Sequence, residues 1–304
     1  MRVVTLAAAA LYAVLSATSV TAQTSEPRRI ELPRGDGTTI DISIWDRGAG
    51  ADLALVVLGG SDCLPNERRS WFGRVLDGAE ARWVVSVDKE GAGHDPAAPD
   101  QCGPTYEQTS VEARRALDHV RALTWLRRDL DLPASAAFQL LATSAGGTAA
   151  CAVAGATDDV QAMALLSTAG GASFADDMRQ LTENEARIAA EMERIQTDPR
   201  LGQTWLGSDN PEIWWWSALP LDCAGQMDGY AGPVLVVHGS EDQSSPVGSA
   251  RRLVALLEQR DGVSVDYVEM PGAGHDLFIA SADKPEGGDG LDVALDWLAD
   301  RAPD

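Results

Sequence analysis

Residues 138–151 read Phe138-Gln-Leu-Leu-Ala-Thr-Ser-Ala-Gly-Gly-Thr-Ala-Ala-Cys151, and this stretch decides the fold. The apolar run at its start predicts a buried strand, and the small residues at its end predict the beginning of a helix. A strand that turns at once into a helix crowds its pivot residue, so small side chains are needed two positions before and after it. Ala142 and Gly146 stand there around Ser144. The pattern predicts a strained turn that holds the Ser144 hydroxyl above a sheet edge, beside a helix N-terminus that favours negative charge.

The segment Ala142-Thr-Ser-Ala-Gly146 differs at one position from G-x-S-x-G, a turn that exposes a serine nucleophile. Taken alone, it is also compatible with a plain glycine-rich turn. A serine hydroxyl is barely ionised at neutral pH, so a nucleophilic serine needs a neighbouring base. The functional interpretation therefore depends on finding that base elsewhere in the chain.

Histidine suits the role of base because its pKa lies near neutral pH, and the chain has four histidines. His275 is preferred, because it lies in the glycine-rich segment 271–277 that follows the last predicted strand. His94, in a loop, is the alternative. His119 falls inside a predicted helix and is expected to be partly exposed. His238 ends a strand, where packing or a backbone hydrogen bond explains it.

A histidine base needs a carboxylate that fixes its tautomer and stabilises the imidazolium. The segment Gly239-Ser-Glu-Asp-Gln-Ser-Ser-Pro246 directly follows a predicted strand. Asp242 is the preferred carboxylate and Glu241 the alternative. The simpler interpretation of Asp242 is a solvated loop residue.

Attack on a carbonyl creates an oxyanion, which needs preorganised N–H donors. The backbone N–H of Ala145, directly after the serine, is one candidate. Gly60 or Ser61, in the loop after the apolar run that ends at Leu58, is expected to supply the other. Without the other motifs, Gly59-Gly60 would indicate no more than the turn that ends a strand.

Apolar runs alternate with helical patterns along most of the chain. An opening hairpin spans 29–45, apolar runs fall at 52–58, 82–88, 138–142, 160–166, 233–239 and 263–270, and helical patterns fall at 66–81, 109–130, 247–260 and 291–299. This alternation predicts an α/β fold with a doubly wound, mostly parallel sheet and an antiparallel start. Reactive groups in such sheets gather beyond the carboxyl ends of the strands.

Residues 171–229 interrupt this alternation with a charged segment that carries an apolar stripe at helical spacing. Trp205, Trp214, Trp215 and Trp216 follow within it. We expect this segment to be a helical cap inserted into a core made of residues 23–170 and 230–304. The tryptophans are interpreted either as the core of the cap or as the lining of an apolar substrate pocket.

The first 22 residues have the features of a secretory signal peptide. A positive start at Met1-Arg2 precedes an apolar run, and Val20-Thr21-Ala22 is a small-residue cleavage site. The alternative, a membrane anchor, is disfavoured because the apolar run is short. We expect export to the periplasm or the medium, with no membrane attachment after cleavage.

Charge and cysteine content narrow the function further. The formal net charge of −22 disfavours partners such as nucleic acid and anionic membranes. The cysteines show no zinc-like spacing, so no metal site is expected. In an oxidising compartment Cys63 and Cys102, each in a loop after a strand, are candidates for a disulfide. For Cys151 the sequence favours a buried small apolar residue over a bond to Cys223.

Together these motifs resemble the α/β-hydrolase superfamily. The order Ser144, Asp242, His275 matches the Ser…Asp/Glu…His order of that fold. Asp88-Lys-Glu-Gly-Ala-Gly-His94 is similar to its D-x-x-G-x-G-x-S loop, with histidine in place of serine. Two departures are that Ala142 replaces the first elbow glycine and that Leu58-Gly59-Gly60 lacks the usual histidine before the oxyanion glycine. The resemblance spans about residues 29–302 outside the insertion, which in this family would be a cap.

The resemblance implies a serine hydrolase without a cofactor, most simply one that acts on small-molecule esters or other acyl compounds. A peptidase or amidase with the same triad is the first alternative, because the sequence does not separate ester from amide substrates. A non-catalytic hydrolase-like binding protein is the second. A haloalkane or epoxide hydrolase is disfavoured because the nucleophile position holds serine, not aspartate.

Overall fold

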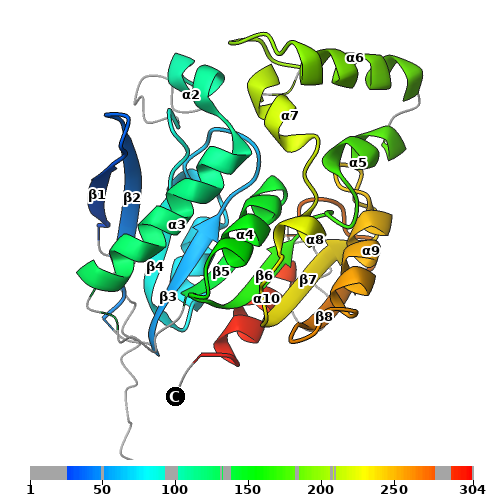
Figure 1. The fold of residues 1–304 in the computed structure, drawn as a ribbon. Helices are drawn as coiled ribbons and strands as arrows, with labels where there is room; N and C mark the ends of the chain where they lie inside the picture. The colour runs from blue at the N-terminus through cyan, green and yellow to red at the C-terminus, as the bar shows by residue number, and fades with distance from the viewer. Residues whose placement is uncertain are drawn as a thin grey trace, which may run out of the picture.

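In this computed structural model, residues 26–48, 51–92, 102–130, 132, 138–181, 185–205, 208, 210–277 and 289–302 are described. Within them, strands pair into one sheet (Figure 1). Its spatial order is β1 (Arg28–Pro33), β2 (Thr39–Asp46), β4 (Ala81–Val87), β3 (Ala51–Leu58), β5 (Phe138–Thr143), β6 (Val160–Leu166), β7 (Pro233–Gly239), β8 (Ser264–Met270). Strands β3 to β8 are mutually parallel, whereas β1 is antiparallel to β2 and β2 is antiparallel to β4. The predicted α/β class and mostly parallel sheet are confirmed.

Helices cover both faces of the sheet. In chain order the helices are η1 (Asn66–Arg68), α1 (Phe72–Gly78), α2 (Pro104–Thr109), α3 (Glu112–Asp129), α4 (Ala145–Ala156), α5 (Phe174–Gln180), α6 (Glu185–Thr197), α7 (Glu212–Ala218), α8 (Cys223–Gln226), α9 (Val247–Leu257) and α10 (Gly290–Ala299). Helices α3, α4, α8 and α9 pack on one face, and α1 and α10 on the other. Strands β3, β5, β6 and β7 are consequently buried on both faces, which explains why each is a nearly continuous apolar run.

Two predicted helices are interrupted. The pattern over 66–81 becomes η1 followed by α1, and the pattern over 109–130 becomes the end of α2 followed by α3. The first break follows from Asn66, whose buried amide donates to the carbonyl of Val57 (2.9 Å) and to Ser86 Oγ (3.1 Å), which ties this turn to the sheet. At the second break Ser110 and Val111 are extended. The periodicity of apolar residues over 66–81 and 109–130 does not reveal such breaks.

Helices α5, α6 and α7 lie beyond the carboxyl ends of the strands, at the top of Figure 1. Their apolar side chains form a cluster separate from the two sheet faces, with Ile188, Met192, Ile195, Trp205, Trp214 and Trp215 as its largest buried members. Helix α8 falls inside the predicted range of the insertion, yet it packs against α4. Among the described residues, no helix has the length and apolarity that crossing a membrane requires. The predicted signal peptide, residues 1–22, lies outside the described residues.

Two disulfides tie distant parts of the chain together. Cys63, in the loop after β3, is bonded to Cys102, just before α2. Cys151 in α4 is bonded to Cys223 in α8. The expectation that Cys151 is an unpaired apolar residue is therefore wrong. The cause is the packing of α8 on α4, a contact between residues 72 positions apart that no local pattern reveals.

Candidate active site

Ser144 lies at the turn from β5 into α4 and has the strained backbone that crowding predicts. Its φ is 52° and its ψ −129°, and its N–H donates to the carbonyl of Leu166 (2.8 Å). A Cβ on Gly146 would lie 2.3 Å from the carbonyl oxygen of Leu58 and 2.4 Å from that of Gly59. No side chain fits in that space, so position 146 must be glycine for the turn to form. Ala142, in the strand before the turn, is fully buried.

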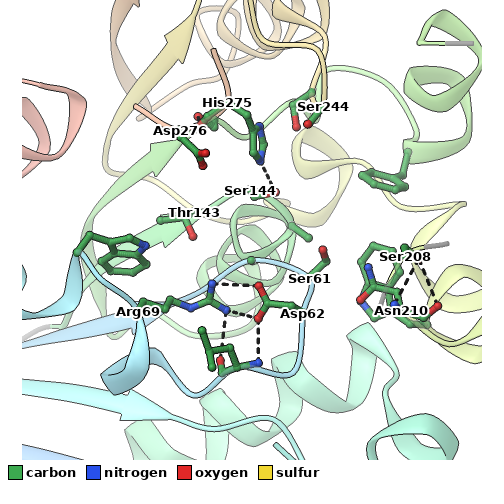
Figure 2. Close-up of a pocket in the computed structure, with 18 of the residues that line it drawn as sticks. Ser61, Asp62, Arg69, Thr143, Ser144, Ser208, Asn210, Ser244, His275 and Asp276 are labelled. Carbon is green, nitrogen blue, oxygen red and sulfur yellow. Dashed lines mark hydrogen bonds and ion pairs between the residues drawn. The ribbon is translucent and has the colours of Figure 1, made fainter. Parts of the chain in front are cut away.

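His275 lies beside Ser144, in the loop after β8 (Figure 2). Its Nε2 is 3.1 Å from Ser144 Oγ. The backbone carbonyl of His275 accepts a hydrogen bond from Ser167 Oγ (2.7 Å). Ser167 also has a positive φ, 51°, and its N–H donates to the carbonyl of Val237 (2.9 Å). The imidazole is thus held from its backbone by a second strained serine at the end of β6.

Asp242 completes this hydrogen-bonded chain from the loop after β7. Its Oδ2 accepts from His275 Nδ1 (2.8 Å), and its Oδ1 accepts from the N–H groups of Ser244 (2.8 Å) and Ser245 (2.9 Å). Burial opposes ionisation of this carboxyl, but these hydrogen bonds outweigh burial, so the pKa of Asp242 is below its ordinary value. Glu241, the alternative carboxylate, is exposed.

Strand pairing brings these two loops together. Gly239 pairs with Met270, so β7 and β8 end side by side at one edge of the sheet. The loops then pack closely, because a Cβ on Gly239 would lie 2.3 Å from the carbonyl oxygen of Ala273. With Nδ1–H donating to Asp242, the Nε2 of His275 is left as the acceptor for the Ser144 hydroxyl proton.

The other histidines have different surroundings. His119 is buried in α3, and its Nδ1 hydrogen-bonds the carbonyl of Arg115 (2.8 Å), so the expectation of partial exposure is wrong. Burial lowers the pKa of His119 to about 3. His238 is fully buried, with Nε2 2.9 Å from the carbonyl of Ser245 and 3.3 Å from Asp242 Oδ2, and burial lowers its pKa. His94 lies outside the described residues.

The loop after β3 flanks Ser144 on the side opposite His275 and Asp242. A Cβ on Gly60 would lie 3.6 Å from Ser144 Cβ and 3.9 Å from its Oγ. Ala145 begins α4 directly after the serine. Among the described residues, the N–H groups of Gly60 and Ser61 donate to no backbone acceptor. Gly60 and Ala145 are therefore adjacent to Ser144, and Ser61 lines the same cavity.

A cavity of about 850 Å³ opens above Ser144, a size typical of a small-molecule site. Its wall on the side of α5 and α7 is apolar, with Phe174, Met178, Trp214 and Trp215. Its opposite wall is polar, with Asp62, Arg68, Arg69, Ser70 and Arg74. Arg69 pairs with Asp62 (2.6 Å; Figure 2), and Arg74 pairs with Asp289 (2.7 Å). These pairs neutralise the charge that the two arginines would otherwise present to the cavity.

Two of the four predicted pocket tryptophans line this cavity, Trp214 and Trp215. Trp205 instead packs edge-on against Trp215 with ring centroids 4.9 Å apart, and Trp216 is 40% exposed on α7. Successive helical residues are rotated by about 100°, so residues 214–216 cannot all face one side. Trp214 is fixed by its indole N–H, which donates to Glu112 Oε1 (2.5 Å).

Asp177, on α5, is buried and contacts Ser249 on α9. Its Oδ2 accepts from Ser249 Oγ (2.9 Å), while its buried Oδ1 has no partner among the described residues. Burial raises the pKa of Asp177 to about 6. Among the residues that the structure describes, no three histidine, cysteine, aspartate or glutamate side chains are arranged to hold a metal ion.

Several residues around Ser144 escape sequence reasoning. Ser167 carries no recognisable signal, because its role depends on a strained turn next to another strand. Lys89, Tyr106 and Arg115 hydrogen-bond carbonyls of the loop after β3. The one available signal is that Lys89, one of two lysines in the chain, stands in the Asp88–His94 motif.

Comparisons with known proteins agree with this architecture. The prolyl oligopeptidase family matches residues 138–302. The monoacylglycerol lipase of Paleococcus ferrophilus is 18% identical with a TM-score of 0.56, covering 86% of this chain and 99% of that chain. Est1E from Butyrivibrio proteoclasticus is 14% identical with a TM-score of 0.55, covering 91% and 97%. The acylaminoacyl peptidase of Pyrococcus horikoshii is 13% identical with a TM-score of 0.56, covering 83% of this chain and 38% of that chain.

At these identities the solved structures are evidence for the fold. The family match is evidence of a different kind, because it covers more than half of the chain and includes the turn at Ser144 and the loops of Asp242 and His275. The chain therefore belongs to the prolyl oligopeptidase family, within the α/β-hydrolase superfamily.

Proposed function

We propose that this protein is an exported serine hydrolase that cleaves carboxylic esters through an acyl-enzyme on Ser144. Serine hydrolase activity is supported by the family match and by esterase and lipase structures with the same fold. The observation that carries the proposal is the hydrogen-bonded chain from Ser144 Oγ through His275 to Asp242, with distances of 3.1 and 2.8 Å. These hydrogen bonds end at the buried carboxylate of Asp242, which can orient the imidazole of His275.

In the proposed reaction, Ser144 Oγ attacks the ester carbonyl while its proton passes to His275 Nε2. The carbonyl oxygen becomes an oxyanion, held by the N–H of Ala145 and by that of Gly60 or Ser61. As the tetrahedral intermediate collapses, the C–O bond to the alcohol breaks and His275 returns the proton to the leaving alkoxide. Water, deprotonated by His275, then attacks the acyl-enzyme and releases the acid and free Ser144. Asp242 stabilises the imidazolium in both halves.

The cavity supports a small acyl substrate. Trp214 and Trp215, with Phe174, offer an apolar wall for the acyl group beneath the proposed cap of residues 171–229. Residues 23–170 and 230–304 form the proposed core. The chain spans nearly the whole length of the lipase and of Est1E, and 38% of the acylaminoacyl peptidase. The similar length of this chain to the lipase and Est1E favours ester hydrolysis. The family match favours peptide or amide hydrolysis as the second candidate.

Export is part of the proposal. The sequence of residues 1–22 and two disulfides among the described residues support an oxidising destination. N-terminal sequencing of the protein recovered outside the cytoplasm tests this point. A mature chain that starts near Gln23 is the expected result, and an intact Met1 in the cell-associated fraction would contradict it.

A fluorophosphonate probe tests the nucleophile directly. The folded wild type should be labelled, and Ser144→Ala should not. Ser70→Ala is the matched control, because Ser70 is an exposed serine on the same cavity. Equal labelling of wild type and Ser144→Ala would refute the assignment. Lack of labelling and of turnover in the wild type would indicate a hydrolase-like binding protein.

A substrate panel separates the two enzymatic candidates. We expect p-nitrophenyl esters to be hydrolysed with a higher kcat/KM than aminoacyl or prolyl p-nitroanilides, after allowance for the intrinsic reactivity of each bond. A preference for the anilides would replace the esterase proposal with the peptidase one, and Ser144 would keep its role.

A further inference from the structure

The loop after β3 is held by its carbonyl groups, one after another. The carbonyl of Gly59 accepts from Arg115 Nη2 (2.5 Å), that of Gly60 from Lys89 Nζ (2.5 Å), and that of Ser61 from Tyr106 Oη (2.6 Å). The Lys89 ammonium also donates to the carbonyl of Asp62, the residue after Ser61. Four successive carbonyls are thus bound by three side chains.

This arrangement fixes where the N–H groups of the loop point. A trans peptide is planar, and its N–H is directed opposite to its C=O. The N–H of Gly60 therefore points away from Arg115, and the N–H of Ser61 points away from Lys89. Both residues line the cavity, and Gly60 lies against Ser144. The side chains below the loop hold the carbonyls, so the N–H groups are left for a ligand above it.

Lys89 is suited to this position by its shape. Its ammonium is a compact group with three donors, whereas an arginine fork is planar and matches carboxylates. The chain has two lysines among 24 basic residues, and one of them bridges two carbonyls here. The ammonium also lies 6.0 Å from the centroid of the Tyr106 ring. Burial, with the positive charge of Arg115 next, lowers the pKa of Lys89 well below its ordinary value.

Two of the three side chains are themselves anchored. Tyr106 Oη also lies 3.2 Å from Asn210 Oδ1, and Arg115 lies 3.7 Å from Glu112 Oε1. The disulfide at Cys63 fixes the far end of the loop to the segment that precedes α2, the helix of Tyr106. Asn210, Glu112 and Cys102, to which these contacts lead, lie outside the loop, so the loop geometry is imposed by the surrounding structure.

We propose that Lys89, together with Arg115 and Tyr106, positions the peptide units of the loop after β3 so that the N–H groups of Gly60 and Ser61 face the oxyanion. These are positioning residues, and this role rests on the proposed function. A carbonyl that accepts a hydrogen bond from Lys89 also makes the N–H of the same peptide a stronger donor. Both effects act on the transition state, because the oxyanion is absent from the ground state.

Kinetics of Lys89→Met with p-nitrophenyl acetate test the proposal. Loss of one oxyanion donor costs about 10²–10³ in kcat, and loss of its positioning should cost about 30-fold. KM should stay within about threefold, since ground-state binding does not use the oxyanion donors. Affinity for a trifluoromethyl ketone, whose adduct with Ser144 places an oxyanion at the site, should fall in parallel with kcat. Tyr106→Phe, which removes one carbonyl contact and little volume, should lower kcat by about fivefold with the same pattern.

Two variants serve as matched controls. Arg47 also donates to two backbone carbonyls, those of Ala81 (3.2 Å) and Asp77 (3.3 Å), at the opposite edge of the sheet. Tyr230 Oη donates to the carbonyl of Pro233 (3.0 Å), at the amino end of β7. Arg47→Met and Tyr230→Phe should leave kcat unchanged.

Two outcomes would overturn the positioning role. One is a kcat within twofold of wild type in both Lys89→Met and Tyr106→Phe. The other is a loss of ketone affinity matched by an equal rise in KM. Either result, with Ser144→Ala inactive and unlabelled, leaves the proposed hydrolase intact. If Ser144→Ala retains activity and labelling, the proposed function itself fails.

Discussion

The two sides of Ser144 are built in different ways. On the histidine side, Asp242 receives N–H bonds from residues two and three positions ahead, and the loops of Asp242 and His275 follow neighbouring strands. On the other side, the proposed oxyanion side, Lys89, Tyr106 and Arg115 reach the loop after β3 from 29, 45 and 56 positions away. The first side is assembled from short turns at strand ends, and the second from long side chains that converge from other elements.

This difference determines what each side tolerates. The Asp242 turn is closed by N–H groups two and three positions ahead, and a substitution that keeps the Oδ1 acceptor, such as Asp242→Asn, should impair catalysis before it impairs structure. A loop held by distant side chains loses its geometry when any of them is removed. We expect substitutions on the histidine side to abolish turnover with little loss of stability, and those on the oxyanion side to change both.

The largest expected effect is that of Asp242→Asn. An amide presents the wrong hydrogen-bond partner to Nδ1 of His275, so the imidazole adopts the wrong tautomer, and kcat should fall about 10⁴-fold. Steady-state ester hydrolysis measures it, with circular dichroism to verify folding. Glu241→Gln is the matched control and should stay within twofold of wild type, because Glu241 is exposed. Similar losses in both variants would contradict the assignment.

Removal of either disulfide should lower the free energy of unfolding, but only removal of the first should also lower kcat. Replacing Cys63 and Cys102 by alanine opens a loop of 39 residues, and replacing Cys151 and Cys223 opens one of 72. Each pair should lower the free energy of unfolding by about 4 kcal/mol on the chain-entropy account, measured by urea denaturation. Removal of the first pair should also lower kcat by about tenfold, because Cys63 lies at the end of the loop after β3, the proposed source of an oxyanion donor. If replacement of Cys151 and Cys223 lowers kcat as much as replacement of Cys63 and Cys102, the two sides of Ser144 do not differ in the way described.

Two buried carboxyls should give opposite pH dependences of stability. The pKa of Asp177 is raised to about 6 by burial, against about 3.9 in an unfolded chain. Between these pH values the folded protein binds more protons than the unfolded one, so the free energy of unfolding falls as pH rises from about 4 to about 6. Asp177→Asn should remove this fall and be more stable than wild type at pH 7 by about 2 kcal/mol.

Asp242 provides the comparison, because its pKa is lowered. Its stabilising contribution is present above the unfolded-state pKa of about 3.9 and is lost as pH falls through the lower folded-state pKa. Urea denaturation between pH 3 and 7 measures both groups as differences between wild type and each asparagine variant. If the difference in free energy of unfolding between wild type and Asp177→Asn stays constant from pH 4 to pH 6, the pKa of Asp177 is not raised.

The smallest expected effect is a coupling energy. Lys89→Met and Tyr106→Phe act on one loop, so their combined loss of kcat should be about fivefold smaller than the product of the single losses, a coupling of about 1 kcal/mol. Lys89→Met combined with Ser167→Ala, on the histidine side, should be multiplicative. Equal coupling in both pairs would mean that the two sides respond as one unit.

The sequence was sufficient to predict that Asp242 and His275 lie near Ser144, and the reason is physical. His275 and Asp242 lie 131 and 98 positions from Ser144, yet all three follow strands. Strands of a parallel sheet end at one edge, so the prediction needed the strand pattern and short glycine-rich turns. The exposed position of Trp216 and the bond between Cys151 and Cys223 had no such rule behind them. Their placement depends on helix rotation and on the packing of α8 against α4.

By itself, the sequence determined the α/β class, the strained turn at Ser144, and the order of the serine, carboxylate and histidine loops. Each of these follows from backbone geometry over a few consecutive residues or from the rule that parallel strands end together. Tertiary structure alone decided that Lys89, Arg115 and Tyr106 bind the carbonyls beside Ser144. A backbone carbonyl is the same in every residue, so nothing in the sequence marks which side chain will reach it until packing has brought the two together.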